Sequence, residues 1–249
     1  MKKNTITTHN FLNRFKPRNP CLFIAAFSDK RFNCSFRNLS LFTIRKNRKS
    51  ILGRLKLNVG DLVLPQQVHG KRVVCVDSRH RGKGAVRYAC AIPKTDGLIT
   101  AEKNLPIAVL TADCLPIFIH DPQTKTIAVL HAGWKSTHKK IVSNALKILR
   151  TKYKSNPKDL MVVFGPAMRK CCYEVGKEFK QRFPRAIIKR GNKIFLDLIK
   201  ANTEQLTSAG IKKRNIIDCK LCTCCDKRFF SYRREGKKTG RMLAVIALQ

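Results

Sequence analysis

A cysteine and two histidines stand at the ends of apolar runs in this chain. His69 follows LVLPQQV, Cys114 follows AVLTAD and His131 follows TIAVL. Side chains at strand ends often bind ligands or catalyse reactions, because a sheet holds them rigidly. Two imidazoles and one thiolate suit Zn²⁺, and three protein ligands leave a fourth tetrahedral position for water or substrate. The residue types therefore indicate a catalytic metal site. Their spacing matches no local metal motif, however. The same residues would also fit purely structural roles, as a buried cysteine and two hydrogen-bonded loop histidines.

The apolar runs around these residues are short, rich in β-branched side chains and bounded by turn residues, which is typical of strands. The expected strands cover residues 21–28, 62–76 with a loop at His69, 96–100, 106–111, 115–121, 126–133, 160–166, 215–219 and 241–248. The expected helices cover residues 45–58, 137–151, 173–183 and 195–209. Strands interspersed with helices predict one mixed α/β domain built in layers.

The net charge of the chain is unusually positive. Its 249 residues include 52 lysines and arginines against 15 acidic residues, a formal charge of +37. These basic residues are spread over several segments, which favours a solvated basic surface over a dedicated nucleic-acid groove. No compact nucleic-acid motif is present in the sequence. A basic nucleic-acid-binding protein is therefore a hypothesis that rests on charge alone.

The first residues, MKKNTITTHNFLNRFKPRNP, are basic and polar and lack the apolar segment of a secretory signal. We expect residues 1–19 to form a flexible basic arm and residues 20–249 to form a single catalytic domain. No apolar run approaches the roughly 20 residues that a membrane span needs. The sequence thus predicts a cytoplasmic protein without a membrane partner, whose eleven cysteines stay reduced.

Six motifs occur in one order along the chain: PQQVHGKRVV, DGLIT, TADCLPIFIHD, LHAGWKS, GPAMRKCCYEVGKEF and CTCCDKRFFSYRREGKKTGRMLAVIAL. Together they resemble the multicopper polyphenol oxidase (laccase domain) family. That family is now described as zinc-dependent purine nucleoside phosphorylases with adenosine deaminase side activity. The resemblance implies a four-layer α/β/β/α fold, with His69, Cys114 and His131 as zinc ligands in one cleft. It also implies phosphorolysis of adenosine, inosine and methylthioadenosine, with phosphate as co-substrate.

Residues near the implied ligands have further expected roles. Asp113 is expected to orient a ligand or move a proton, unless its carboxylate only accepts backbone N–H groups in the turn. Lys135 of HAGWKS stands where the family has arginine, and lysine cannot clamp phosphate through two parallel hydrogen bonds. Arg233 of SYRRE is expected to contact an anion. Asn38 of SFRNLSL matches a family segment loosely and is expected to bind substrate.

A cysteine hydrolase that edits peptidoglycan precursors is the main alternative. Cys114 would be its nucleophile and His131 its base, with no metal. His69 separates the two hypotheses, because a metal site needs it and a Cys–His dyad does not.

Copper can occupy a His₂Cys site adventitiously. A four-copper oxidase centre is excluded, because the chain has six scattered histidines and no H-x-H pair. The cysteines outside the implied cleft, Cys171, Cys172, Cys219, Cys222, Cys224 and Cys225, are expected to be free and structural.

Overall fold

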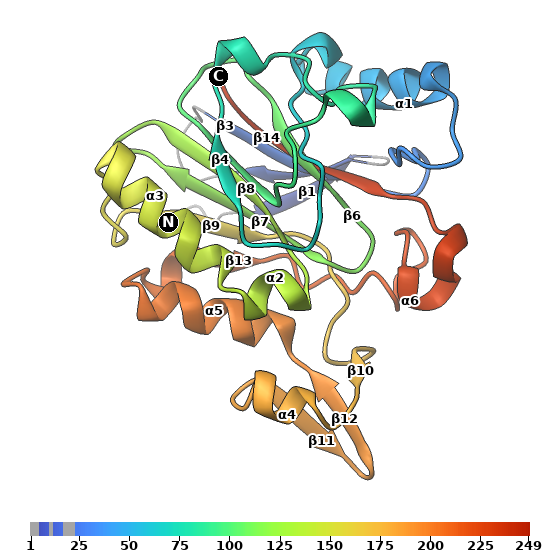
Figure 1. The fold of residues 1–249 in the computed structure, drawn as a ribbon, viewed down its shortest axis with the longest axis vertical. Helices are drawn as coiled ribbons and strands as arrows, with labels where there is room; N and C mark the ends of the chain where they lie inside the picture. The colour runs from blue at the N-terminus through green and yellow to red at the C-terminus, as the bar shows by residue number, and fades with distance from the viewer. Residues whose placement is uncertain (1–4, 10–11, 17–22) are drawn as a thin grey trace.

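Two β-sheets lie face to face at the centre of the molecule (Figure 1). The computed structural model describes residues 5–9, 12–16 and 23–249. The first sheet is antiparallel and has the strand order β1 (Thr5–His9), β2 (Leu12–Lys16), β3 (Phe23–Ser28), β14 (Met242–Leu248) and β6 (Ile107–Thr111). The last strand of the chain therefore lies between β3 and β6, inside a sheet that begins with the first strands.

The second sheet is mixed, and most of the strand ends that adjoin candidate site residues belong to it. Its strand order is β13 (Ile216–Asp218), β9 (Met161–Phe164), β7 (Leu115–Asp121), β8 (Thr126–Ala132), β5 (Gly97–Thr100) and β4 (Val73–Cys75). β7 and β8 form the expected hairpin, with Pro116 opposite His131. The two outer pairs, β13 with β9 and β4 with β5, are parallel.

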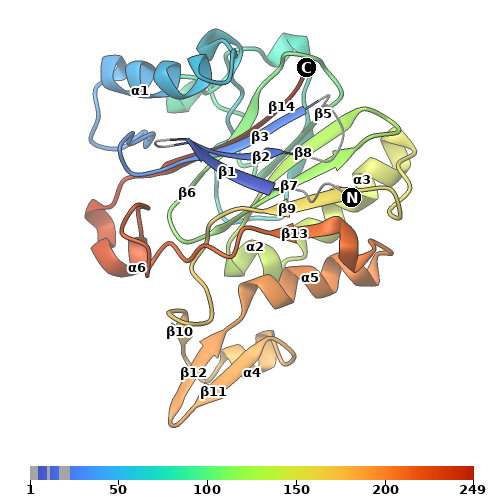
Figure 2. The same ribbon diagram turned by 180° about the vertical axis from the view of Figure 1, so that it is seen from behind.

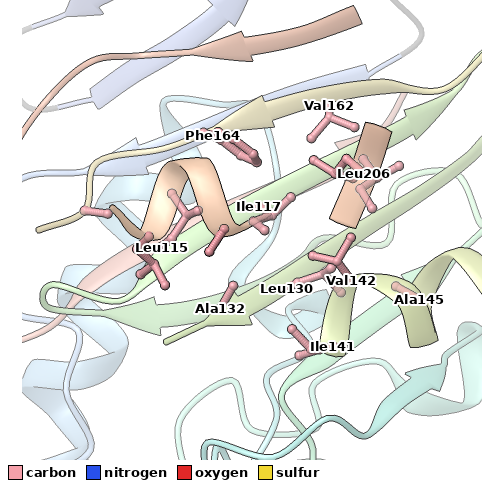
Figure 3. Close-up of a cluster of buried hydrophobic side chains, with 14 of the residues drawn as sticks. Leu115, Ile117, Leu130, Ala132, Ile141, Val142, Ala145, Val162, Phe164 and Leu206 are labelled. Carbon is pink, nitrogen blue, oxygen red and sulfur yellow. The ribbon is translucent and has the colours of Figure 1, made fainter. Parts of the chain in front are cut away.

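Alternating side chains divide the interior into three apolar layers. On β14, Leu243, Val245 and Ala247 pack toward α1 (Leu41–Gly53), whereas Ala244, Ile246 and Leu248 pack between the sheets. The far face of the second sheet is covered by α3 (Ile141–Tyr153) and α5 (Leu198–Ser208). Figure 3 shows this third layer, in which Ile117, Leu130 and Phe164 of the sheet meet Val142 and Leu206 of the helices. The layers follow the order α/β/β/α, as the resemblance implied.

Three of the expected helices differ from the structure. The helix expected over residues 45–58 is α1, which begins four residues earlier and ends five residues earlier. Residues 137–151 are divided between α2 (Trp134–His138) and α3, because Lys140 adopts a left-handed conformation with φ 62°. The expected helix 173–183 is wrong for most of its length. Glu174–Val175 forms strand β10, and only Phe179–Arg182 is helical, as α4. Pairing of β10 with β12 (Lys193–Leu196) overrides the local helical pattern.

Two further regions are arranged differently from the expectation. β10, β12 and β11 (Ile187–Arg190) form a small sheet that projects from one end of the molecule with α4 (Figure 2). β1 and β2 fall inside the stretch expected as a flexible arm, and they are paired strands. The remainder of that stretch lies outside the described residues. No helix of the described residues is long and apolar enough to cross a membrane.

His120 on β7 provides a prediction about pH and stability. Its side chain is only 6% exposed, stacks on Phe23 with ring centroids 4.1 Å apart, and has no hydrogen-bond partner among the described residues. Burial lowers its pKa from 6.5 to about 4, with a smaller opposing effect from Asp121. The folded protein therefore binds this proton more weakly than the unfolded chain, and the free energy of unfolding should fall as pH drops from 6.5 toward 4. One such group contributes a slope of at most about 1.4 kcal/mol per pH unit.

The measurement is urea unfolding across this pH range for wild type and His120→Phe. The wild type should lose more stability than the variant on acidification. Equal pH slopes for the two proteins would show that His120 is not the group responsible.

Candidate metal centre and active site

The structure brings the three implied ligands to one place. The donor atoms of His69, Cys114 and His131 all lie within 4.8 Å of one another. Cys114 Sγ is 3.8 Å from His69 Nε2, and the two imidazole rings meet edge to face with centroids 4.7 Å apart. A nitrogen–nitrogen–sulfur donor set of this kind fits Zn²⁺.

The second sheet fixes two of these positions directly. Cys114 immediately precedes β7 and His131 lies near the end of β8, and the pairing of these strands places the two side chains next to each other. His69 comes from the loop before β4 and has a left-handed backbone conformation with φ 57°. A non-glycine residue in that conformation must be held by its surroundings.

Asp96, at the start of β5, holds the loop of His69. Its carboxylate accepts the backbone N–H groups of Val68, His69 and Gly70 at 3.2, 2.9 and 2.7 Å. The same carboxylate lies 2.9 Å from His131 Nδ1 and is fully buried. Burial would raise the pKa of Asp96, but His131 and the backbone donors outweigh it and hold the pKa below its ordinary value. One ionised carboxylate thus organises both histidines.

Asp96 was not predicted from the sequence. The only available signal was an aspartate directly before the glycine that begins the DGLIT strand, and many turns share that pattern. Its contacts match the outer hydrogen bonds that metal-bound histidines usually make, because Nδ1–H donated to a carboxylate leaves the Nε2 lone pair free for a metal.

Cys114 and His131 influence each other's ionisation. Burial would raise the pKa of the Cys114 thiol, but His131 and then His69 outweigh it and lower the pKa. Burial would lower the pKa of His131, but Cys114 and Asp96 outweigh it and raise the pKa. The pair therefore favours a thiolate next to an imidazolium. A thiolate is the form that binds metals and the form that attacks carbonyl groups, so this pair alone fits both hypotheses.

Gly133 has no side chain, and this leaves room for the side chains of Cys114 and His69. A Cβ atom at this position would lie 2.7 Å from Cys114 Sγ and 3.3 Å from His69 Cδ2. The backbone of Gly133 has φ −72°, which any residue adopts. Glycine is therefore required here by close contact with the donors and not by backbone conformation.

Gly133→Ala should consequently leave the fold intact and displace the thiol. We expect roughly a 10- to 100-fold loss of metal affinity, similar to the loss of an orienting contact. Competition with a chromophoric zinc chelator measures this loss. Gly53→Ala is the matched control, because a Cβ there meets no atom within 4 Å. Wild-type affinity in Gly133→Ala would show that the thiol is not a ligand.

A cavity of about 860 Å³ opens next to the three donors. Such a volume accommodates a small organic ligand. Its aromatic wall consists of Phe36, Tyr88, Trp134, Tyr173, Phe179 and Tyr232. Its basic side chains are Arg37, Lys135, Arg233 and Arg241. The cavity can therefore stack a planar ring and attract an anion close to the metal ligands.

The expected substrate residues have different positions in the structure. Lys135 and Arg233 line the cavity, as expected. Arg233 donates from Nη2 to the Glu174 carbonyl at 2.9 Å and lies 5.8 Å from the Tyr173 ring. Asn38 is not among the described residues that line the cavity, and its neighbour Arg37 lines it instead. Arg241 and Tyr173 were also missed, because neither stands near the three ligands in the sequence.

Asp113 uses its carboxylate to hold another loop. It accepts the Thr223 hydroxyl at 2.6 Å and the Arg233 backbone N–H at 2.7 Å. Its own backbone has φ 85°, and its side chain is buried. Both donors come from a distant segment and not from its own turn. The expected role of Asp113 in orienting a ligand or moving a proton stays a prediction.

Buried Arg48 supports the opposite rim of the cavity. It donates to the carbonyl groups of Cys34, Gly84 and Ala85 at 2.6, 2.9 and 2.8 Å. Its guanidinium lies 4.2 Å from the centroid of the Phe36 ring. These contacts fix the segment that carries Phe36 and Arg37 into the cavity.

Comparisons with known proteins agree with this fold. A match to the family described as multi-copper polyphenol oxidoreductase laccase spans residues 30–249. The purine nucleoside phosphorylase YlmD of Bacillus subtilis (strain 168) is 36% identical over 213 residues, which is 82% of this chain and 77% of that protein. Adenosine deaminase RL5, from an unidentified prokaryote, is 31% identical over 223 residues, covering 86% of this chain and 85% of that protein. The crystal structure of YlmD from Geobacillus stearothermophilus has a TM-score of 0.93 at 28% identity and covers 99% of this chain and 100% of that one.

Proposed function

The chain belongs to the multi-copper polyphenol oxidoreductase laccase family, and from this premise we propose that it is a zinc-dependent purine nucleoside phosphorylase with adenosine deaminase side activity. The observation that carries the proposal is the meeting of His69, Cys114 and His131 at a cavity with aromatic and basic walls. Adenosine, inosine and methylthioadenosine are the proposed nucleosides, with phosphate as the second substrate.

The family's descriptive name does not define the chemistry of this chain. Oxidation by four copper ions needs many histidine ligands, and this chain has six histidines in total. Two of them stand in the three-donor site. We therefore propose zinc as the resident metal and copper only as an adventitious occupant.

We assign zinc binding to His69 Nε2, the Cys114 thiolate and His131 Nε2. When bound, zinc supplies Lewis-acid polarisation and a lowered pKa for water. Asp96 keeps the proton on His131 Nδ1 and so holds that imidazole in the tautomer that binds metal. The protein contributes the geometry of the three donors, of which His131 is buried, Cys114 is half-buried and His69 is exposed.

We assign substrate binding to the cavity walls. The aromatic rings of Phe36, Trp134 and Tyr173 offer faces on which a purine stacks. Arg233, Lys135 and Arg37 attract phosphate and place it near the nucleoside. The backbone of Arg233 is fixed by Asp113, so Asp113 acts as a positioning residue through Arg233.

A cysteine hydrolase acting on peptidoglycan precursors is the second candidate. The thiolate–imidazolium preference of Cys114 and His131 favours it, because that pair is the activated form of a Cys–His dyad. The position of His69 favours the zinc enzyme, since a dyad makes no use of a second imidazole 3.8 Å from the thiol.

One assay separates these functions. Zinc-loaded protein is incubated with adenosine, with and without phosphate, and the products are separated by chromatography. Adenine that forms only with phosphate establishes the phosphorylase, and inosine in both samples establishes the deaminase. No turnover by protein that has bound zinc would overturn the proposal and favour the Cys114–His131 hydrolase.

A further inference from the structure

Four cysteines form a second cluster away from the three-donor site. Cys171, Cys172, Cys222 and Cys225 place their Sγ atoms within 4.8 Å of one another. Cys225 Sγ is 3.1 Å from Cys172 Sγ and 3.5 Å from Cys171 Sγ. The sequence pairs these residues in two motifs about fifty positions apart, and only the fold brings them together.

The second sheet explains why the two motifs meet. β9 and β13 are parallel neighbours, so both chains leave the sheet at the same edge. Figure 2 shows the segment after β13 continuing toward α6 (Tyr232–Glu235), and the segment after β9 continuing toward β10. Ala167 joins them through the bonds Ala167 N–H to Leu221 O at 3.3 Å and Thr223 N–H to Ala167 O at 3.1 Å.

The backbone also supports the Cys222–Cys225 pair. The Asp226 N–H donates to the Cys222 carbonyl at 2.9 Å and closes a tight turn. Burial would raise the pKa of Cys222, but backbone N–H groups of Cys225, Arg169 and Cys224 outweigh it and lower the pKa. N–H groups that point at a sulfur atom stabilise a thiolate.

We propose that these four thiolates bind a second, structural Zn²⁺ ion. Four protein ligands close the coordination shell, which distinguishes a structural zinc site from the open three-ligand site. The C-x-x-C spacing of Cys222 and Cys225 is common in such sites. Zn–S bonds of about 2.3 Å in a tetrahedron set sulfur–sulfur distances of roughly 3.8 Å, so the four Sγ atoms need shifts only on the order of 1 Å.

The four thiols are crowded, and the sulfur atoms of Cys172 and Cys225 are only 3.1 Å apart. A bound divalent cation removes the thiol protons and holds the thiolates together. Four sulfur atoms within 4.8 Å of one another fit a metal site better than the free structural cysteines that the sequence indicated.

The second ion would connect two walls of the catalytic cavity. The segment with Cys171 and Cys172 continues into Tyr173 and Glu174, which line the cavity. The segment with Cys222 and Cys225 contains Thr223, which binds Asp113, and leads to Arg233. Zinc at the four-cysteine cluster thus holds Tyr173 and Arg233 at a fixed separation.

The test is a metal count on the full chain, purified under reducing conditions with zinc supplied. Wild type should hold about two zinc ions, one for each ligand group. His69→Ala should retain the four-cysteine ion and lose the other. Cys222→Ser/Cys225→Ser should lose the four-cysteine ion, and Cys90→Ser, an exposed cysteine outside both groups, should match wild type.

Cobalt substitution gives a readout that needs no cysteine variant. His69→Ala loaded with Co²⁺ should show the intense visible bands of a tetrahedral cobalt tetrathiolate. Their absence, or a His69→Ala protein that binds no zinc while remaining folded by circular dichroism, overturns the proposal. A Cys172–Cys225 disulfide found by mass spectrometry in zinc-loaded, reduced protein overturns it as well. All three outcomes are independent of nucleoside turnover, so they are distinguishable from failure of the proposed function.

Discussion

Asp96→Asn is expected to weaken zinc binding and to lower kcat/KM by roughly 10- to 100-fold, as loss of an outer hydrogen-bond partner of a metal ligand does. Each carboxylate oxygen of Asp96 has two N–H neighbours, from the 68–70 loop and from His131. An asparagine replaces one of these oxygens with an NH₂ group. Whichever way the amide turned, its NH₂ group would face other N–H donors and would find no acceptor. A buried donor without a partner costs about 1–3 kcal/mol, so the free energy of unfolding should fall as well.

Asp121→Asn is the matched control for this prediction. Asp121 is buried like Asp96, but only its Oδ1 accepts hydrogen bonds, from the N–H groups of Gln123 and Thr124. Its Oδ2 has no partner among the described residues, so an amide NH₂ group fits there without facing a donor. Zinc competition and kcat/KM should therefore separate the two variants. Asp96→Asn with the affinity of Asp121→Asn would show that the charge of Asp96 does not orient the ligands.

The strands were predictable from sequence because their signals are local. Apolar, β-branched runs that end at Asp121-Pro122 or Gly165-Pro166 define β7 and β9 without knowledge of their partners. The failures lie where long-range pairing decides the conformation. Residues 173–183 have helical spacing, yet Glu174–Val175 joins a strand pair whose partner lies nineteen residues further along. The break at Lys140 has no glycine or proline to announce it.

The candidate site shows the same division between local and distant information. His69, Cys114 and His131 are recognisable because each ends an apolar run inside a motif. Asp96 and Arg241 stand directly before two other strands, β5 and β14, and no local pattern indicates that Asp96 contacts His131 or that Arg241 lines the cavity. Asn38 follows the cavity-lining residue Arg37 directly, and its expected role in substrate binding stays a prediction.

Several of the missed residues are supporting groups. Arg48 holds three carbonyl groups of segments far apart in the chain, and Asp96 holds the 68–70 loop. Such groups have no sequence signature, because a buried charge is defined by partners that the fold supplies. The residues that contact a ligand are thus easier to find in a sequence than the residues that hold them in place.

His69→Ala is expected to abolish zinc binding at the three-donor site. Two remaining ligands, Cys114 and His131, cannot complete the three-ligand pattern of a catalytic zinc site. The kcat/KM for adenosine phosphorolysis should therefore fall by more than the roughly 100-fold that follows removal of a hydrogen-bond partner of a metal ligand. His138→Ala is the control, because His138 is an exposed histidine outside the metal-ligand groups and outside the catalytic cavity.

The same variant separates the zinc enzyme from the cysteine hydrolase. His131 lowers the pKa of Cys114 more strongly than His69 does, so His69→Ala leaves most of the thiolate–imidazolium pair in place. A hydrolase that depends on this pair would keep its activity. Its Cys114 would still be alkylated rapidly by iodoacetamide, as measured by peptide mass spectrometry. A zinc enzyme would lose phosphorolysis, while Cys114 in zinc-supplied protein would become easier to alkylate once the metal no longer covers it. Full phosphorolysis by His69→Ala without zinc at this site would contradict the zinc mechanism.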